Sequence, residues 1–205
     1  PYSLFKNDAF YDTAGVQQRY RYVEYVKWRL DAEWYTTLVG KLVLKTSAKI
    51  GLLGQWTSKT GLSPFERFEL GGDGLNNQNF GLNGRDIISL RGYDVSDIMT
   101  PFPGGAGVFD KFTVELRYPI SLNPSSTIFV TAFAQGGNAW LNAKDFNPFD
   151  LKRSVGMGLR VFLPMFGTLG FDYGLGFDKP ALINSGSRKW SDFARFNIVL
   201  GFEPD

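Results

Sequence analysis

Apolar and polar side chains alternate along most of this 205-residue chain, and this alternation limits its possible folds more than any other feature. Successive side chains of a β-strand point to opposite faces of a sheet, so alternation predicts strands with one apolar and one polar face. Seven segments follow the pattern, the fourth less clearly than the others: 26–34, 41–56, 111–120, 127–135, 154–163, 168–177 and 195–202. We therefore predict an all-β fold with about seven antiparallel strands.

The composition of the chain excludes several classes of functional site. The sequence contains no Cys and no His, which removes disulfides, thiolate chemistry and the commonest general base and metal ligand. It also lacks the Gly-x-Ser-x-Gly pattern of a serine hydrolase. The net charge of +2 is too small to indicate a nucleic-acid partner. We expect no catalytic site, no metal site and no cofactor, and hence a protein that is not an enzyme.

The alternation fits two kinds of barrel, which differ in where the apolar face points. A soluble lipocalin-like barrel turns this face inward, whereas a membrane barrel turns it outward. A polar face that mixes charges with glycines, and Trp and Phe near the ends of the apolar face, favour the membrane barrel. The predicted connections also alternate in length, with short ones at 39–41, 123–125 and 165–167 and long ones at 57–110, 137–153 and 178–192. Short periplasmic turns and long extracellular loops alternate in this way in outer-membrane barrels.

The direction of the last predicted strand assigns the two chain ends to sides of the membrane. This strand runs toward the short connections, so we expect Asp205 on the periplasmic side and Pro1 on the side of the long loops. Bacterial single-chain barrels usually have an even number of strands, so seven strands imply others before Pro1. Residues 1–205 are therefore interpreted as the C-terminal portion of a larger antiparallel transmembrane β-barrel. The expected location is the outer membrane of a Gram-negative bacterium, in contact with outer-membrane lipid.

The connection 57–110 is far longer than usual, and such long loops are commonly functional or disordered. It contains Arg91 directly before Gly92, a residue that permits a sharp reversal of the backbone. A planar guanidinium at such a turn can bind an inward-facing carboxylate or amide, and Glu115 and Gln135 are the candidates. The alternative is that Arg91 is an ordinary solvated loop charge.

Several sequence elements resemble the BamA family of outer-membrane assembly factors. The run FERFELGG (Phe65–Gly72), followed by SLRGYD (Ser89–Asp94), resembles the sixth extracellular loop of that family. Residues 114–120, 133–140 and 154–174 resemble, in the same order, the strands that close its barrel. The resemblance covers about the last two-thirds of the chain, and the first third matches only by its alternation. The loop elements supply these candidate site residues: Phe65, Arg67, Gly71, Gly72, Arg91, Gly92 and Tyr93.

The resemblance implies a sixteen-stranded barrel that follows periplasmic POTRA domains and holds its long loop in the lumen. It also implies that Arg91 pairs with acidic residues of the barrel wall, with Glu115 as one partner. Gln135 lies where many members carry Asp, and an amide accepts a hydrogen bond without the charge-assisted strength of a carboxylate. Two further departures are the longer stretch 73–88, which is similar to the Bacteroidota branch, and residues 203–205 after the terminal aromatic residue.

The function that the resemblance implies is insertion of other β-barrels into the outer membrane, without chemistry. The last strand, expected over 194–202, pairs weakly with the first strand of the barrel and leaves a seam that can open. An open edge is a template to which an incoming strand can add. The expected seam residues are Phe196, Ile198, Leu200, Gly201 and Phe202. An ordinary closing strand is the alternative. The expected partners are client β-barrel proteins and accessory outer-membrane or periplasmic subunits.

Three other functions stay open from the sequence. A related secretion pore would share the Arg91 loop element but would move an unfolded chain through the lumen. A parent protein with an upstream patatin-like lipase domain would be an enzyme, although nothing in residues 1–205 can form its active site. A passive porin is the simplest alternative, and the loop elements argue against it.

Overall fold

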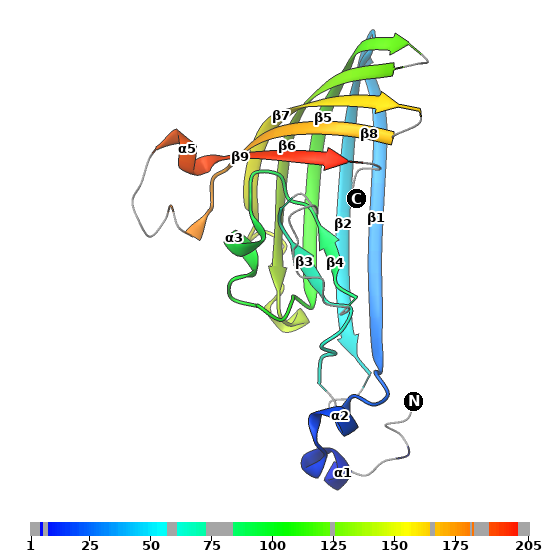
Figure 1. Cartoon of the computed structure of the whole chain (residues 1–205), viewed down its shortest axis with the longest axis vertical. Coiled ribbons are helices and arrows are strands. Elements are labelled where there is room, and N and C mark those ends of the chain that lie inside the picture. The colour runs from blue at the N-terminus through cyan, green and yellow to red at the C-terminus, as the bar shows by residue number, and fades with distance from the viewer. Residues whose placement is uncertain are drawn as a thin grey trace.

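Seven antiparallel strands, joined in sequence order, form one curved sheet (Figure 1). The computed structural model describes residues 5, 8–56, 61–72, 84–123, 126–164, 167–180, 182 and 189–200. The strands are β1 (Tyr25–Val39), β2 (Leu42–Gln55), β5 (Val108–Asn123), β6 (Ser126–Trp140), β7 (Lys152–Leu163), β8 (Gly167–Gly176) and β9 (Ala194–Leu200). Each strand pairs with the next one in this order. The seven strands predicted from the alternation are confirmed.

Two strands extend further than the alternation predicted, where they meet the long loop. β5 begins at Val108 and β6 continues to Trp140, and these two residues are register partners. Residues 108–111 and 137–140 are all buried. A strand that is buried on both faces loses its alternation, which is why the sequence pattern placed the start of β5 too late and the end of β6 too early. The connections predicted at 57–110 and 137–153 are therefore shorter, and span 56–107 and 141–151.

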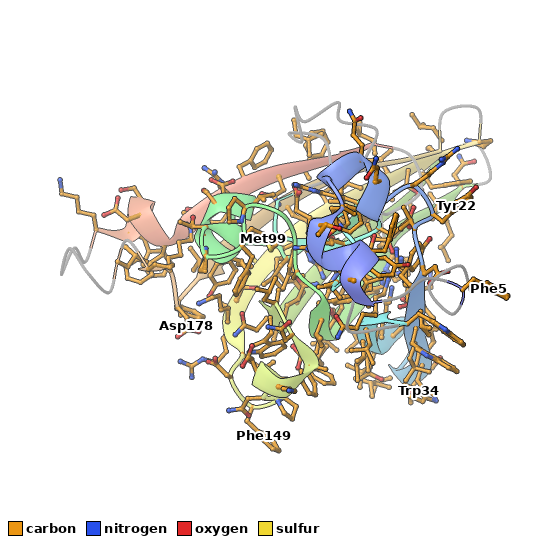
Figure 2. The ribbon with its side chains drawn as sticks, turned by 90° about the horizontal axis from the view of Figure 1, so that it is seen from below. Phe5, Tyr22, Trp34, Met99, Phe149 and Asp178 are labelled. Atoms are coloured by element: carbon orange, nitrogen blue, oxygen red, sulfur yellow. The ribbon has the colours of Figure 1, made fainter. Side chains whose placement is uncertain are left out.

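The sheet buries its polar face and exposes its apolar face. On β5, Glu115 is 1% exposed, whereas its neighbours Val114 and Leu116 are 49% and 38% exposed. Figure 2 shows Trp34 of β1 on the outside of the molecule and Met99 of the long loop on the inside. Exposed aromatic and aliphatic side chains over a buried charged face are the pattern of a membrane barrel and not of a lipocalin-like one. The prediction of an all-β antiparallel barrel portion is confirmed. We call the polar face the inner face and the apolar face the outer face.

The long loop folds into a small unit that packs against the inner face. Its strands β3 (Phe68–Leu70) and β4 (Asp86–Ile88) pair in parallel, and the helix α3 (Val95–Met99) follows. The loop and the sheet share a buried hydrophobic core. Its members are Phe68, Leu70, Ile88, Leu90, Tyr93, Ile98, Met99 and Ala106 from the loop with Leu53, Phe109 and Ala139 from the sheet. This core therefore lies between the loop and the inner face.

Gly51 of β2 makes room for two aromatic rings of this core. A Cβ atom at this position would overlap the ring of Phe109 and would lie 2.7 Å from the ring of Phe68. The two rings pack edge to face with their centroids 4.7 Å apart, a geometry that aromatic pairs prefer. The glycine thus lets the loop approach the sheet closely.

Short helices flank the strands: α1 (Asp8–Thr13) and α2 (Val16–Arg19) before β1, the 3-10 helix η2 (Ala143–Asp145) between β6 and β7, and α5 (Trp190–Phe193) before β9. Within the described part of the chain, no helix has the length and apolar character needed to cross a membrane. Gly40, with φ of 59°, forms the predicted tight turn between β1 and β2. The turn residues 124–125 and 165–166 lie outside the described residues, as do Pro1 and Asp205.

Candidate functional site

Arg91 reaches the inner face because the loop backbone turns sharply beside it. The Tyr93 amide donates to the Leu90 carbonyl over 3.2 Å and closes a tight turn. Gly92 has φ of 92°, a conformation that residues with side chains rarely adopt. A Cβ atom at Gly92 would also lie 3.1 Å from the backbone nitrogen of Gly176 in β8. Gly92 therefore permits both the turn and the close approach of the loop to β8.

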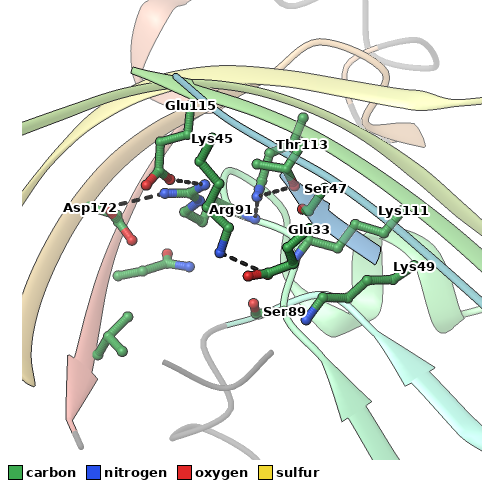
Figure 3. A pocket seen from close by; sticks show the side chains of 13 residues that line it. Glu33, Lys45, Ser47, Lys49, Ser89, Arg91, Lys111, Thr113, Glu115 and Asp172 are labelled. Carbon is green, nitrogen blue, oxygen red and sulfur yellow. Dashed lines mark hydrogen bonds and ion pairs between the residues drawn. The ribbon is translucent and has the colours of Figure 1, made fainter. Parts of the chain in front are cut away.

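The side chain of Arg91 is buried between two carboxylates (Figure 3). It also contacts an aromatic ring. Its Nη2 lies 2.7 Å from Oε2 of Glu115 on β5, and its Nη1 lies 3.8 Å from Oδ1 of Asp172 on β8. The guanidinium also lies over the ring of Phe133 on β6, 3.7 Å from the centroid. Arg91 is 6% exposed, so these contacts act in a medium of low dielectric constant, where they are stronger than in water. The structure thus places Arg91 against Glu115 and not in solvent.

Gln135 contacts the backbone of Arg91 and not its guanidinium. The Arg91 amide donates to Oε1 of Gln135 over 3.1 Å, and Nε2 of Gln135 donates to Oγ1 of Thr113 over 3.0 Å. The second carboxylate beside the guanidinium belongs to Asp172 instead. Asp172 of β8 therefore supplies the negative charge that an Asp at position 135 would bring.

Two further arginines extend these contacts into a buried network. Nε of Arg117 lies 2.7 Å from Oε1 of Glu115, and Arg160 donates from Nη1 and Nη2 to the two oxygens of Asp172, each over 2.7 Å. Positive and negative groups alternate from Arg117 to Glu115, Arg91, Asp172 and Arg160, and we call these five residues the Arg91 network. Removal of one partner from a buried pair costs about 3–5 kcal/mol, because the other charge stays buried without compensation.

Tyr93 fixes the loop to the ends of two strands. Its hydroxyl donates to the Arg153 carbonyl at the start of β7 over 2.7 Å and accepts from the Asp178 amide, just after β8, over 2.9 Å. Burial raises the pKa of the Tyr93 hydroxyl, which therefore stays protonated and able to donate. Burial alone would also raise the pKa of Asp178, but the hydrogen bonds that its carboxylate accepts from Arg153 outweigh burial and lower that pKa.

The other predicted loop residues shape the loop itself. Arg67 donates from Nε to the Ser63 carbonyl over 2.7 Å, and burial lowers the pKa of its guanidinium. Gly71 and Gly72 have φ of 118° and 71°, so each takes a backbone conformation that favours glycine. Phe65 is exposed. The structure therefore separates these four residues, which form the loop, from the Arg-Gly-Tyr element, which meets the sheet.

The described residues of β9, 194–200, share seven register pairs with β8. Its outer face carries Phe196 and Ile198, which are exposed, and its inner face carries Asn197 and Val199, which are buried. Leu200 is the last described residue and pairs with β8. The remaining predicted seam residues, Gly201 and Phe202, lie outside the described residues.

Several residues of the site escaped the sequence analysis. Asp172 and Arg160 lie on polar faces of the predicted strands, but only the register of β7 with β8 shows that they meet. Phe133 lies in the segment whose alternation was least clear, and the structure puts it on the inner face beneath Arg91. Lys27 of β1 lies 2.8 Å from Oδ2 of Asp86 in the loop. Phe133 lies two positions before Gln135 and therefore on the same face of the strand, which is the signal that could have placed it on the inner face.

A polar cavity of about 30 Å³ lies beside the Arg91 network (Figure 3). A cavity of this size has room for a water molecule. No group of three or more acidic residues that could hold a metal ion occurs among the described residues. The sequence supplies neither His nor Cys for acid–base or thiol chemistry. The gathered charges and hydrogen bonds are suited to holding a segment of chain in place.

Comparison with known proteins assigns a family. A model of the Omp85 superfamily domain matches residues 9–203. A search of curated proteins found no match. Members of the Omp85 superfamily are outer-membrane proteins of Gram-negative bacteria, and they assemble or transport other proteins rather than catalyse reactions.

Proposed function

Because this chain belongs to the Omp85 superfamily, we propose that residues 1–205 form the C-terminal portion of the barrel of a BamA-type insertase. The parent protein inserts other β-barrels into the outer membrane and uses no cofactor or catalytic group. Its partners are outer-membrane lipid, client β-barrel proteins and accessory outer-membrane or periplasmic subunits. In this proposal the C-terminus is periplasmic, and the loop 57–110 enters the lumen from the extracellular side.

The observation that carries the proposal is the attachment of the long loop to the inner face by the Arg91 network. A porin has a water-filled interior, whereas here a loop with its own share of a hydrophobic core covers the inner face. Buried ion pairs add little net stability, because the cost of desolvation offsets their attraction. Their best-attested role is to select one packing arrangement of the chain over others. The network supports a function in which the loop keeps one position inside the barrel while a client folds beside it.

The strand β9 provides the second part of the mechanism. It is the last strand of the sheet and has β8 as its neighbour among the described residues. An unpaired backbone group in lipid costs several kcal/mol, so a client strand gains free energy by pairing with an available strand edge. Folding of the client in lipid then drives its insertion, with β9 at the seam as the template.

The test is reconstitution of the parent protein into lipid vesicles, with an unfolded β-barrel client added outside. Arg91→Ala leaves Glu115 and Asp172 buried without the cation between them. We expect client folding, followed by heat-modifiable mobility on gels, to slow by about tenfold or more, because 1.4 kcal/mol already corresponds to a factor of ten. Arg21→Ala, which removes an exposed arginine before β1, is the matched control.

Two outcomes would contradict the proposal in different ways. If Arg91→Ala leaves both client folding and the thermal stability of the barrel unchanged, the loop does not have this role. If the client instead crosses unfolded into the vesicle interior, the parent protein is a polypeptide-secretion pore.

A further inference from the structure

A hollow on the outer face lies at the end of the sheet that carries the long connections. Its volume of about 540 Å³ is within the range of small-molecule binding sites. Its floor is formed by β6, where Ala134 and Gly136 present little or no side chain. Larger apolar side chains surround this floor: Phe112 and Val114 from β5, Leu151 and Val155 before and within β7, and Phe177 after β8. We call this apolar hollow the β6 groove.

The connection between β6 and β7 closes one end of the β6 groove. Nδ2 of Asn138 donates to the Asp150 carbonyl over 2.7 Å and to Oδ2 of Asp150 over 3.3 Å. These bonds hold Leu151 against Gly136, where a Cβ atom would lie 3.3 Å from Cδ1 of Leu151. Phe149 of the same connection is 89% exposed and points away from the molecule (Figure 2). Defined contacts thus build this end of the groove, beside an aromatic side chain of the kind found at membrane interfaces.

Arg153 lies at the same end of the groove and has hydrogen-bond donors to spare. It lines the groove, and its side chain is 71% exposed. Asp178 fixes its orientation by accepting from Nε over 3.1 Å and from Nη2 over 3.0 Å. A guanidinium has five N–H donors in one plane, so the donors of Nη1 stay available among the described residues. Nζ of Lys152 donates to the Asp178 carbonyl over 3.5 Å, which brings a second cation close to the same carboxylate. An anion can therefore bind Arg153 without displacing Asp178.

An apolar groove with a guanidinium at its end suits a lipid that carries a phosphate beside an acyl chain. The chain fills the groove, since an empty hollow forfeits dispersion contacts, and the phosphate accepts charge-assisted hydrogen bonds from Arg153. A second hollow of about 490 Å³ lies on the same face around Ala132, and none of the described residues that line it is charged. Of these two hollows, the β6 groove alone combines an apolar floor with a cation.

We propose that the β6 groove binds one lipid A molecule, with an acyl chain over Ala134 and Gly136 and a phosphate on Arg153. The choice of this lipid rests on the proposed function, which puts the long connections on the extracellular side. Lipopolysaccharide forms the extracellular leaflet of the outer membrane, and its lipid A portion carries phosphates next to acyl chains. The bound lipid fixes the depth of β6 and β7 in this leaflet.

Native mass spectrometry of the intact parent protein in detergent counts the bound lipid molecules. The probes are purified lipid A, chemically dephosphorylated lipid A and phosphatidylglycerol. We expect one lipid A to bind, and the dephosphorylated form to bind at least about tenfold more weakly, because the charge-assisted hydrogen bonds are lost. Arg153→Gln should remove this difference between the two forms. Equal affinity of the unchanged protein for both forms, or for lipid A and phosphatidylglycerol, overturns the proposal.

Ala134→Phe tests the groove without changing a charge. The added ring fills the floor of the β6 groove and should abolish the binding of lipid A. Ala132→Phe makes the same change two residues earlier on the same face, in the uncharged hollow, and should leave binding unchanged. Heat-modifiable mobility on gels checks that both variants are folded. Equal binding by the two variants overturns the proposed position. No client is present in these measurements, so their failure is distinct from a failure of the insertase function, which client folding reports.

Discussion

Arg91 and Tyr93 hold the loop to the sheet by different physical means. Arg91 acts through buried charges, and each of its carboxylate partners binds a second arginine. Tyr93 acts through two neutral hydrogen bonds at the ends of β7 and β8, next to the exposed side chain of Arg153. Neither contact depends directly on the other, so changes in pH or sequence should affect them separately.

Tyr93→Phe should loosen one end of the loop and leave the Arg91 network in place. The substitution leaves the Arg153 carbonyl and the Asp178 amide without the hydroxyl, at a cost of about 1–3 kcal/mol. Hydrogen exchange of the parent protein in detergent micelles is the measurement. The Asp178 amide should exchange faster, while the Arg91 amide, which donates to Gln135, should keep its protection. Equal loss of protection at both amides would show that the two contacts are one cooperative unit.

Acid should weaken the contact between Arg153 and Asp178. The pKa of Asp178 is lowered in the folded protein despite burial, because its carboxylate accepts hydrogen bonds from the Arg153 side chain and amide. The contribution to stability is therefore complete above the ordinary carboxyl pKa of about 3.9 and is lost as the pH falls through the lowered value. Exchange at the Arg153 amide, corrected for its intrinsic pH dependence, should lose protection in this range. Asp178→Asn should remove the pH dependence, and a dependence that persists would assign it to another group.

The end of the sheet that the loop covers differs from the rest in having both faces buried. Phe109 and Leu53 belong to the core shared with the loop. Here the first residue of β5, Val108, pairs with the last residue of β6, Trp140. The close approach depends on Gly51, which leaves space for aromatic rings that come from two different elements. The packing of this end is thus a property of the loop and the sheet together.

Gly51→Ala should therefore weaken the packing of the whole loop against β2. The added methyl group meets the rings of Phe109 and Phe68, and such overpacking typically costs about 1–3 kcal/mol. Gly54→Ala on the same strand is the control, because the nearest atom to its Cβ lies 3.6 Å away. The measurement is the urea midpoint of loop proteolysis in micelles. Identical midpoints for the two variants would show that the ring pair moves aside at no cost.

The alternation located all seven strands, because the period of two survives wherever one face meets the polar interior and the other an apolar solvent. It failed at Val108 and Trp140, where both faces are buried. The resemblance to a known loop suggested the pairing of Arg91 with Glu115. The contacts with Asp172 and Phe133 could not be predicted, because they depend on the register of several strands and on the path of the loop, which no local pattern contains.

The described structure has two apolar surfaces in different surroundings. One is the core between the loop and the inner face, which is enclosed by protein. The other is the outer face, where large apolar side chains are exposed on β1, β5, β6, β7, β8 and β9. Only the second depends on lipid for its stability, so a charge placed on it should be costly according to its depth in the membrane.

Leu116→Arg should destabilise the barrel by about 2–4 kcal/mol, because Leu116 lies in the middle of β5 on the outer face. Leu122→Arg, one residue before the end of the same strand, should cost at most about 1 kcal/mol, since charges near the interface are tolerated. Urea unfolding in lipid vesicles measures both. Equal costs would show that the middle of this face does not lie in hydrocarbon.

The strand residues that Arg91 and Tyr93 contact all come later in the chain than the loop itself. The Arg91 amide bonds a residue 44 positions further on, and the Tyr93 hydroxyl bonds residues 60 and 85 positions further on. Contacts of such large sequence separation form late, since the chain between them must first be ordered. During synthesis, residue 91 emerges long before β8 exists. The loop can dock only after β8 has joined the sheet, and a docked loop is therefore a sign that the strands around it are complete.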